Sequence, residues 1–159
     1  MLTINVICVG KLKETFFRDA VAEYSKRLSK FCKLEIIELP DEKIPNKPNL
    51  KIINEIKQKE CNNIISHIKQ ESYVIALDSR GIELTSEEMS SSIEYLSLET
   101  SHITFIIGGS LGLTQELLHK ANKILSFSKM TFPHQLIRIF LLEQIYRGFK
   151  ISSGEAYHK

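Results

Sequence analysis

Ile103-Thr-Phe-Ile-Ile-Gly-Gly-Ser-Leu-Gly112 is an apolar strand that runs directly into a glycine loop. Farther along the chain, Leu125-Ser-Phe-Ser-Lys-Met-Thr-Phe-Pro-His-Gln135 predicts a short strand that breaks at a proline and leads into a long helix. Each stretch places bare backbone at the carboxyl end of a strand. Because ligands of open α/β sheets bind outside these ends, the last third of the chain is predicted to hold a binding site.

Strand and helix patterns alternate along the whole chain. Apolar runs predict strands at Ile4–Val9, Leu34–Leu39, Tyr73–Leu77, Ile103–Ile107 and Ile124–Phe127. Helical spacing and capping residues predict helices at Glu14–Leu28, Asn49–Ile68, behind the capping box Thr85-Ser-Glu-Glu88, at Thr114–Ala121 and at His134–Lys150. Ser79-Arg80-Gly81 is expected to form a turn. The alternation predicts an α/β fold, with a mostly parallel sheet covered by helices on both faces, in a single domain over residues 1–159.

The composition is typical of a soluble globular protein, with 43% hydrophobic and 25% charged residues in a chain of 159. No apolar run approaches the roughly 20 residues of a membrane span, and the apolar N-terminus lacks the basic leader of a signal peptide. Cys8, Cys32 and Cys61 are widely spaced and form no CxxC or Cys/His cluster. We therefore expect no metal site, no disulfide and a cytoplasmic location.

Charge is spread unevenly along the chain. The net charge is +2, but the residues after position 100 carry seven Lys and Arg against three Asp and Glu, a local charge of +4. A basic excess around the glycine loop favours an anionic partner such as nucleic acid. A random imbalance of surface charge is the alternative.

The predicted final helix is apolar most of the way round its surface. A helix on the outside of a monomer needs only one apolar stripe. The pattern favours contact with a second subunit, and a central position in the monomer's own core is the alternative. The side chains concerned are Leu136, Ile137, Ile139, Phe140, Leu141, Leu142, Ile145, Tyr146 and Phe149.

The glycine loop fits more than one kind of site. Its G-x-S-x-G spelling is that of a nucleophile elbow, in which Ser110 would attack with His134 or His158 as base. However, the next helix starts too late for an elbow, and no Asp follows Ser110 to orient the histidine. The loop also lacks the Rossmann pattern and the lysine of a P-loop. It is either a loop that a flat ligand approaches closely or a plain tight turn.

The stretch before the final helix suits an adenosine-like ligand, because apolar side chains alternate there with hydroxyls and Pro133 keeps Phe132 extended. Simple core packing of these side chains is the alternative.

His134 is at the start of the final helix, where the helix dipole disfavours the imidazolium. Arg138, Arg147 and Lys150 are candidate phosphate contacts, although the spacing of Glu143 and Arg147 also suits an ordinary helical ion pair.

Several long motifs in register resemble the RlmH-type rRNA methyltransferases of the SPOUT class, and the likeness covers essentially the whole chain. The motifs are Val9-Gly-Lys-Leu-Lys13, Ile37-Glu-Leu-Pro-Asp-Glu-Lys43, Ile106-Ile-Gly-Gly-Ser-x-Gly112, Leu125-Ser-Phe-Ser-Lys-Met-Thr-Phe-Pro-His134, Leu141-x-Glu-Gln-x-Tyr-Arg147 and Gly154-Glu-Ala-Tyr-His158.

The resemblance implies a SPOUT-type fold with a C-terminal trefoil knot, a feature that periodicity does not predict because knots are nearly absent from proteins. It further implies a homodimer, S-adenosylmethionine as methyl donor, and transfer to N3 of a pseudouridine in large-subunit 23S rRNA on the assembled ribosome. By position, the cofactor would contact Leu77, Gly108, Phe127, Ser128, Lys129, Met130, Thr131 and Phe132.

The resemblance also implies a set of residues near the reaction. Tyr157 and His158 match a tail that reaches the active site of the partner subunit, and Arg147 and His134 match polar positions close to it. A histidine is a suitable acceptor for the N3 proton, and His158 is preferred over His134. Two other readings compete with the methyltransferase: a non-catalytic ribosome-binding or RNA-binding module of the same fold, and a Ser110 hydrolase.

Overall fold

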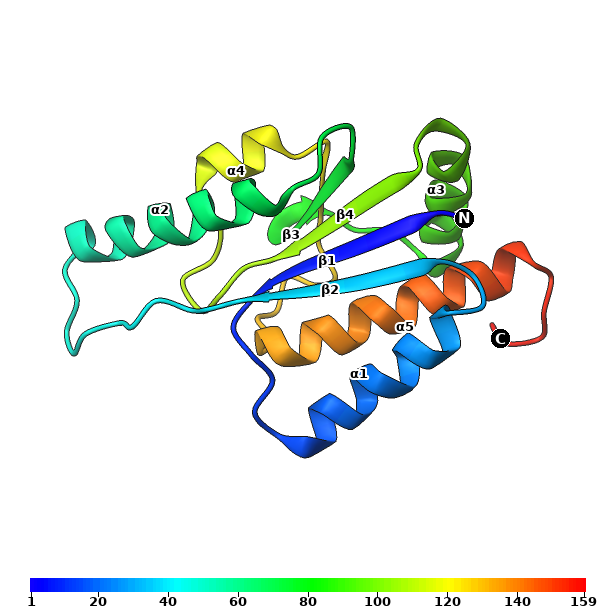
Figure 1. Ribbon diagram of the computed structural model, residues 1–159, viewed down its shortest axis with the longest axis horizontal. Helices are drawn as coiled ribbons and strands as arrows, with labels where there is room; N and C mark the ends of the chain where they lie inside the picture. The colour runs from blue at the N-terminus through cyan, green and yellow to red at the C-terminus, as the bar shows by residue number, and fades with distance from the viewer.

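Five parallel strands form the centre of the molecule in the computed structural model, which describes all residues from 1 to 159 (Figure 1). The strands follow the order β2-β1-β4-β3-β5 across the sheet. Their bounds are β1 Thr3–Val9, β2 Lys33–Leu39, β3 Tyr73–Ile82, β4 His102–Ile107 and β5 Lys123–Leu125. Because every strand is parallel, all five carboxyl ends lie along one edge of the sheet.

Helices cover both faces of this sheet. The helices are α1 Thr15–Leu28, α2 Leu50–His67, α3 Ser86–Glu99, α4 Gln115–Lys120 and α5 His134–Ser152. The first, third and fifth helices share one hydrophobic core with the sheet, and the second and fourth share the other. The predicted α/β fold with a parallel sheet is confirmed. No helix has the length and hydropathy needed to cross a membrane.

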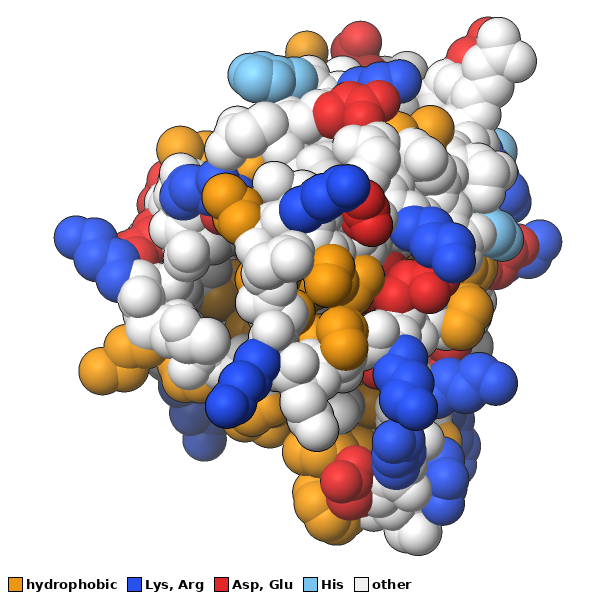
Figure 2. Space-filling view, turned by 90° about the vertical axis from the view of Figure 1, so that its left-hand side faces the viewer, with side chains coloured by type: hydrophobic (Ala, Val, Ile, Leu, Met, Phe, Trp, Pro, Cys, Tyr) orange, Lys and Arg blue, Asp and Glu red, His pale blue; other side chains and the backbone are white.

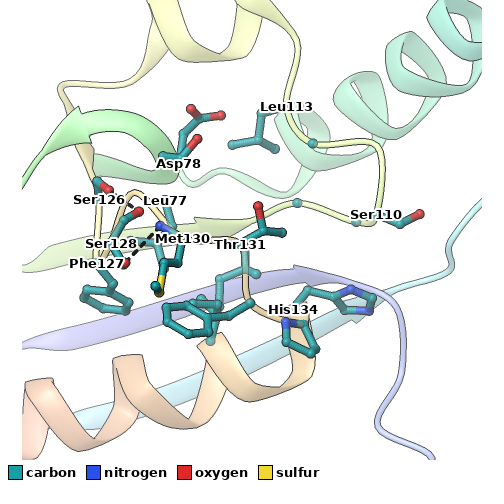
Figure 3. Close-up of a pocket in the computed structure, with 18 of the residues that line it drawn as sticks. Leu77, Asp78, Ser110, Leu113, Ser126, Phe127, Ser128, Met130, Thr131 and His134 are labelled. Atoms are coloured by element: carbon teal, nitrogen blue, oxygen red, sulfur yellow. Dashed lines mark hydrogen bonds between the residues drawn. The ribbon is translucent and has the colours of Figure 1, made fainter.

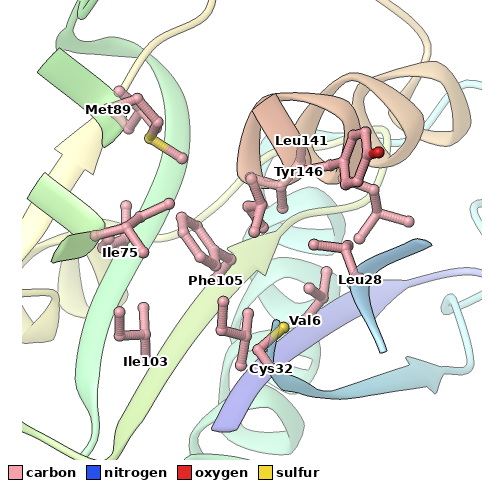
Figure 4. Close-up of a cluster of buried hydrophobic side chains, with 14 of the residues drawn as sticks. Val6, Leu28, Cys32, Ile75, Met89, Ile103, Phe105, Leu141 and Tyr146 are labelled. Atoms are coloured by element: carbon pink, nitrogen blue, oxygen red, sulfur yellow. The ribbon is translucent and has the colours of Figure 1, made fainter. Parts of the chain in front are cut away.

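The two cores follow from the alternation of side chains along the strands. In β1, which is buried throughout, Ile4 and Val6 enter the core of α1, α3 and α5, whereas Ile7 and Val9 enter the core of α2 and α4. Successive side chains of a strand point to opposite faces, so a strand in the middle of such a sheet is apolar at nearly every position. Phe105 of β4 lies among the side chains of the larger core (Figure 4).

Local capping residues define where two helices begin, as their sequence predicted. The Glu88 N–H donates to Thr85 Oγ1 (3.0 Å) and the Thr85 N–H donates to Glu88 Oε1 (3.2 Å), which completes the predicted capping box of α3. The Leu117 N–H donates to Thr114 Oγ1 (3.2 Å) at the start of α4. Each cap satisfies backbone donors that a helix leaves free in its first turn.

Most of the apolar surface of α5 is buried within the monomer. This helix packs between α1 and α3 against the sheet, and Leu141, Leu142, Ile145 and Tyr146 are buried there. The structure therefore shows the central position that the sequence left as the alternative to a subunit contact. Phe140 is left 38% exposed near the beginning of the helix.

Two boundaries near the site differ from their predicted positions. The predicted turn at Ser79-Arg80-Gly81 is part of β3, which shifts register and pairs again with β5 at Ile82. A side chain at Gly81 would come within 2.6 Å of the Ile124 backbone, so only glycine allows this approach. In addition, β5 ends at Leu125 and not at Phe127, and its last contact with β3 is the hydrogen bond from the Ser126 N–H to the Ile82 carbonyl (2.8 Å).

A buried arginine ties the last helix to the first two strands. Arg138 of α5 is 1% exposed, and its Nη1 donates to Glu38 Oε2 at the end of β2 (2.6 Å). Its Nη2 donates to the carbonyl of Gly10, which follows β1 (3.0 Å). Arg138 is therefore not available to contact phosphate, and this expectation is wrong. A charge without a partner inside a protein is very unfavourable, so this arginine must stay in contact with the two strand ends.

We predict that Arg138→Met lowers the free energy of unfolding by about 3 kcal/mol, because it leaves the Glu38 carboxylate and the Gly10 carbonyl without their shared donor. Arg18→Met is the matched control, since Arg18 is exposed and hydrogen-bonds only to Thr15; we expect it to change the stability by less than about 0.5 kcal/mol. Urea unfolding followed by circular dichroism measures both. Equal stabilities of the two variants would contradict the structural role of Arg138.

Candidate active site

A cavity of about 550 Å³ opens at the carboxyl ends of β3, β4 and β5 (Figure 3). Three segments wall it: residues Leu77 to Ser79 at β3, the glycine loop after β4, and the loop from Leu125 to Pro133 that leads into α5. His134 and Ile137 of α5 complete the lining. The cavity thus lies where the sequence predicted a binding site, and it combines the two stretches of backbone that were singled out there.

Close packing of backbone shapes the glycine loop. A Cβ added at Gly108 would lie 2.9 Å from Leu113 Cδ2, and Gly112 has a φ of +79°, which side chains rarely allow. The glycines therefore let the loop turn tightly while its backbone faces the cavity.

The loop of Phe127 to Phe132 presents backbone that has almost no partner within the protein. Its only hydrogen bonds run from Ser126 Oγ to the Ser128 carbonyl (3.0 Å) and from the Met130 N–H to Ser128 Oγ (3.0 Å). The remaining amides and carbonyls of this segment make no hydrogen bond to protein. Unpaired backbone groups beside an apolar cavity can bind the polar edge of a ligand.

Asp78 places a fixed negative charge in the wall of the cavity. Arg80 donates from Nε to Asp78 Oδ1 (2.8 Å) and from Nη2 to Oδ2 (2.9 Å), and this pairing holds the pKa of the carboxyl group below its usual value. Asp78 is not among the site residues predicted from the sequence, because the segment after Leu77 was expected to form only a turn. Its position directly after a strand, at the edge where ligands bind, is the signal that could have identified it.

The predicted cofactor residues gather at the cavity with one exception. Lys129 is exposed and does not line it. The residues that do line it are Leu77, Gly108, Phe127, Ser128, Met130, Thr131 and Phe132.

His134 also lines the cavity, and its surroundings favour the neutral imidazole. Burial lowers its pKa, and the positive charge of Arg138, one helical turn away, lowers it further, while Asp41 acts in the opposite direction. The preference for the neutral form was predicted from the helix dipole, but burial is its main cause. A neutral histidine in the wall of a cavity can accept a proton.

The other predicted catalytic residues form a separate group, in which the tail after α5 contacts the carboxyl-terminal half of that helix. Arg147 Nη1 lies 3.2 Å from His158 Nδ1, and the Tyr157 hydroxyl donates to Glu143 Oε1 (3.0 Å). The predicted ion pair between Glu143 and Arg147 is confirmed, with Nη2 and Oε1 2.7 Å apart. We name Glu143, Arg147, Tyr157 and His158 the tail cluster.

The tail cluster and His134 stand at opposite ends of the same helix. His134 and Arg147 are separated by thirteen residues, which corresponds to roughly 20 Å at 1.5 Å per helical residue. A second cavity of about 600 Å³ lies between them, and Glu143 lines it together with Phe127, Ser128 and Phe132 of the loop that precedes α5. The four predicted catalytic residues therefore do not form one site within a single protomer.

The arrangement required for a serine hydrolase is absent. Ser110 is exposed at the far side of the glycine loop from Ser128 and Met130 (Figure 3). No histidine hydrogen-bonds to it, although a nucleophilic serine needs such a base within reach.

Comparison with known proteins agrees with this geometry. The family described as Predicted SPOUT methyltransferase matches residues 2–158. The chain belongs to the SPOUT methyltransferase family. A protein of Clostridium botulinum (strain Kyoto / Type A2), named Ribosomal RNA large subunit methyltransferase H, is 58% identical over 99% of this chain and 100% of its own length. A protein of the same name from Clostridium novyi (strain NT) is 56% identical over the same shares.

Membership of the SPOUT methyltransferases confirms the family resemblance on which the sequence-based function rested. It identifies the protein as a methyltransferase and, together with the missing base at Ser110, argues against the hydrolase reading. It also accounts for a cavity walled by backbone at the strand ends, since a methyltransferase must hold a methyl donor.

We predict that protonation of His134 destabilises the fold below pH 6.5, the ordinary pKa of histidine. Because the His134 pKa is lowered in the folded state, the unfolded chain takes up the proton first as the pH falls. The contribution of neutral His134 to the free energy of unfolding is therefore fully present above pH 6.5 and is lost as the pH falls towards the folded-state pKa. His134→Gln should remove this part of the pH dependence in urea unfolding. An NMR titration of the His134 imidazole should give a midpoint below 6.5, and a midpoint at or above 6.5 would contradict the prediction.

Proposed function

We propose that this protein transfers the methyl group of S-adenosylmethionine to rRNA of the large ribosomal subunit. The observation that carries the proposal is the backbone-walled cavity at the strand ends, in a chain 58% identical over its length to a protein named Ribosomal RNA large subunit methyltransferase H. The family resemblance specifies the acceptor as N3 of a pseudouridine on the assembled ribosome. A cytoplasmic location follows from that substrate.

The lining of the cavity fits the proposed cofactor. The free amides and carbonyls between Phe127 and Phe132 suit the hydrogen-bonding edge of an adenine, and Leu77 and Phe127 supply apolar contact for its ring. The Asp78 carboxylate, held in its charged form by Arg80, suits a hydroxyl or ammonium group. S-adenosylmethionine supplies an electrophilic methyl group when bound. Gly108 lines the cavity and presents only backbone to it.

The residues of the chain have two further tasks, namely to orient the acceptor base and to take up its proton. Holding the acceptor nitrogen in line with the methyl group removes much of the entropic barrier. We assign the N3 proton to His158, with His134 as the alternative acceptor, and we assign orientation of the substrate to Arg147 and Tyr157. Because the tail cluster lies far from His134 along α5, we propose that the tail of one protomer serves the cavity of its partner.

Two features of the structure support the proposed homodimer and knot. Apolar side chains remain accessible near the beginning of α5, where Met130 is 74% and Phe140 38% exposed, and they suit a subunit interface. The chain also leaves β5 at the edge of the sheet and crosses the ends of β3 and β4 before His134 reaches Gly10. This crossing is the segment that we propose to be threaded in a trefoil knot.

We predict that the purified protein transfers label from S-adenosylmethionine to undermethylated ribosomes, at a single uridine-derived position of large-subunit rRNA located by mass spectrometry. Leu77→Trp should fill the cavity and abolish both cofactor binding, measured by calorimetry, and methyl transfer. Leu98→Trp, at an exposed position of α3, is the matched control and should leave both unchanged. Absence of transfer to large-subunit rRNA by the unaltered protein would overturn the proposed function.

We predict that His158→Gln lowers kcat by about two orders of magnitude without changing cofactor affinity, because general base catalysis contributes roughly 10²–10⁴-fold. Mixed dimers of His158→Gln and Leu77→Trp protomers test whether the tail acts on the partner. Such a dimer holds one intact site if the tail reaches across, and it should recover about half of the wild-type rate. A tail that serves its own cavity would leave the mixed dimer inactive.

A further inference from the structure

Exposed lysines without ion-pair partners gather at the carboxyl edge of the sheet. They come from the loop between β1 and α1 and from the segment between β2 and the first turn of α2. None of them forms a salt bridge, and each is exposed. We name them the lysine rim: Lys11, Lys13, Lys43, Lys47 and Lys51.

Elsewhere many of the basic side chains are neutralised by neighbours. Lys33 and Lys69 share Glu35, and Lys150 pairs with Glu155. Arg147 pairs with Glu143 on the outer part of α5. The lysine rim differs from these sites because none of its five lysines forms a salt bridge.

Acidic side chains near the lysine rim do not cancel its charge. Glu42 is engaged by Lys59, with Nζ and Oε2 3.5 Å apart, and Glu60 is buried, where desolvation raises its pKa. Glu14, Asp41 and Glu55 remain exposed and form no salt bridge. Three free carboxylates stand against five lysines, so the face as a whole is positive.

Backbone contacts attach the lysine rim to the wall of the cofactor cavity. The Gly10 N–H donates to the Leu39 carbonyl (2.7 Å), and the Leu12 N–H donates to Glu38 Oε2 (3.1 Å), so the two rim loops are joined at their bases. Gly10 also lies against His134, because a Cβ there would be 3.3 Å from His134 Nε2. Since His134 lines the cavity, the loop that carries Lys11 and Lys13 begins at its edge.

The same face is not uniformly polar. Phe16 is 66% and Ile44 39% exposed between the lysines, and Figure 2, which views this side of the molecule, shows Lys and Arg side chains around exposed hydrophobic ones. Surfaces that bind nucleic acid typically combine lysines, which contact the phosphates, with exposed apolar side chains, which contact sugars and bases.

We propose that the lysine rim binds the phosphate backbone of the rRNA substrate and thereby holds the acceptor nucleotide at the mouth of the cavity. The inference rests on the proposed function, because it names the surface on which that substrate docks. Lysine binds phosphate as a point charge and without regard to base sequence. The rim therefore supplies affinity and position, and the cavity supplies the choice of base.

The test compares two triple variants of the full-length protein that lose the same charge. Lys11→Gln/Lys13→Gln/Lys43→Gln removes part of the lysine rim, and Lys26→Gln/Lys30→Gln/Lys120→Gln removes three exposed lysines at the opposite edge of the sheet. Ribosome binding is measured between about 50 and 200 mM salt, together with KM for ribosomes, kcat and cofactor affinity. Each phosphate contact contributes roughly 0.7–0.9 to the slope of log affinity against log salt.

The rim variant should lower this slope by roughly two and raise the KM for ribosomes more than about tenfold near 150 mM salt, with kcat and cofactor affinity unchanged. Replacing the same lysines by arginine should restore the wild-type KM, which separates lost charge from a folding defect. A rim variant that matches the control variant in slope and KM would overturn the proposal. A different outcome would separate the two proposals. If the wild type transfers no methyl group, but the rim variant still lowers the slope of log ribosome affinity against log salt, the lysine rim remains the RNA-binding surface and the proposed function fails.

Discussion

The buried guanidinium of Arg138 is the contact on which the geometry of the site depends. Moving a charge out of water is so unfavourable that Arg138 must keep both the Glu38 carboxylate and the Gly10 carbonyl. These partners lie about one hundred residues earlier in the chain, so one side chain fastens the start of α5 to the ends of β1 and β2. His134 precedes Arg138 by one helical turn and is thereby held against Gly10 at the edge of the cavity.

The parallel sheet determines where the cavity lies. All five strands end at one edge, and the loops after β3, β4 and β5 meet there because these strands are neighbours of one another or of a common strand. The loop from Phe127 to Phe132 leaves most of its amides and carbonyls without protein partners. Such groups are tolerated only where water or a ligand satisfies them. The unpaired backbone groups of this loop are therefore what the proposed cofactor site relies on.

Local sequence predicted the elements and the position of the cavity, because both follow from short-range patterns. The Thr85 capping box, the apolar run before Gly108 and the proline after Phe132 each act within a few residues. Contacts between distant segments were not predictable in this way. The register shift of β3 depends on the close approach of Gly81 to Ile124 in the neighbouring strand. The burial of Arg138 depends on Glu38, and nothing in the helical pattern around Arg138 indicated it.

The body of α5 is held more firmly than the tail that follows it. The helix is held by a buried core and by Arg138, so the separation of roughly 20 Å between His134 and Arg147 is fixed. The tail beyond it makes mostly polar contacts, such as His158 Nε2 to Glu87 Oε1 (2.7 Å), and only its Tyr157 packs against the core, edge-on to Tyr146. Fewer buried contacts therefore hold the tail than hold the body of α5. The proposed use of His158 at the cavity is therefore met most directly by a second protomer whose cavity faces that tail, because the tail cluster and the His134 of one protomer lie at separate positions on one rigid helix.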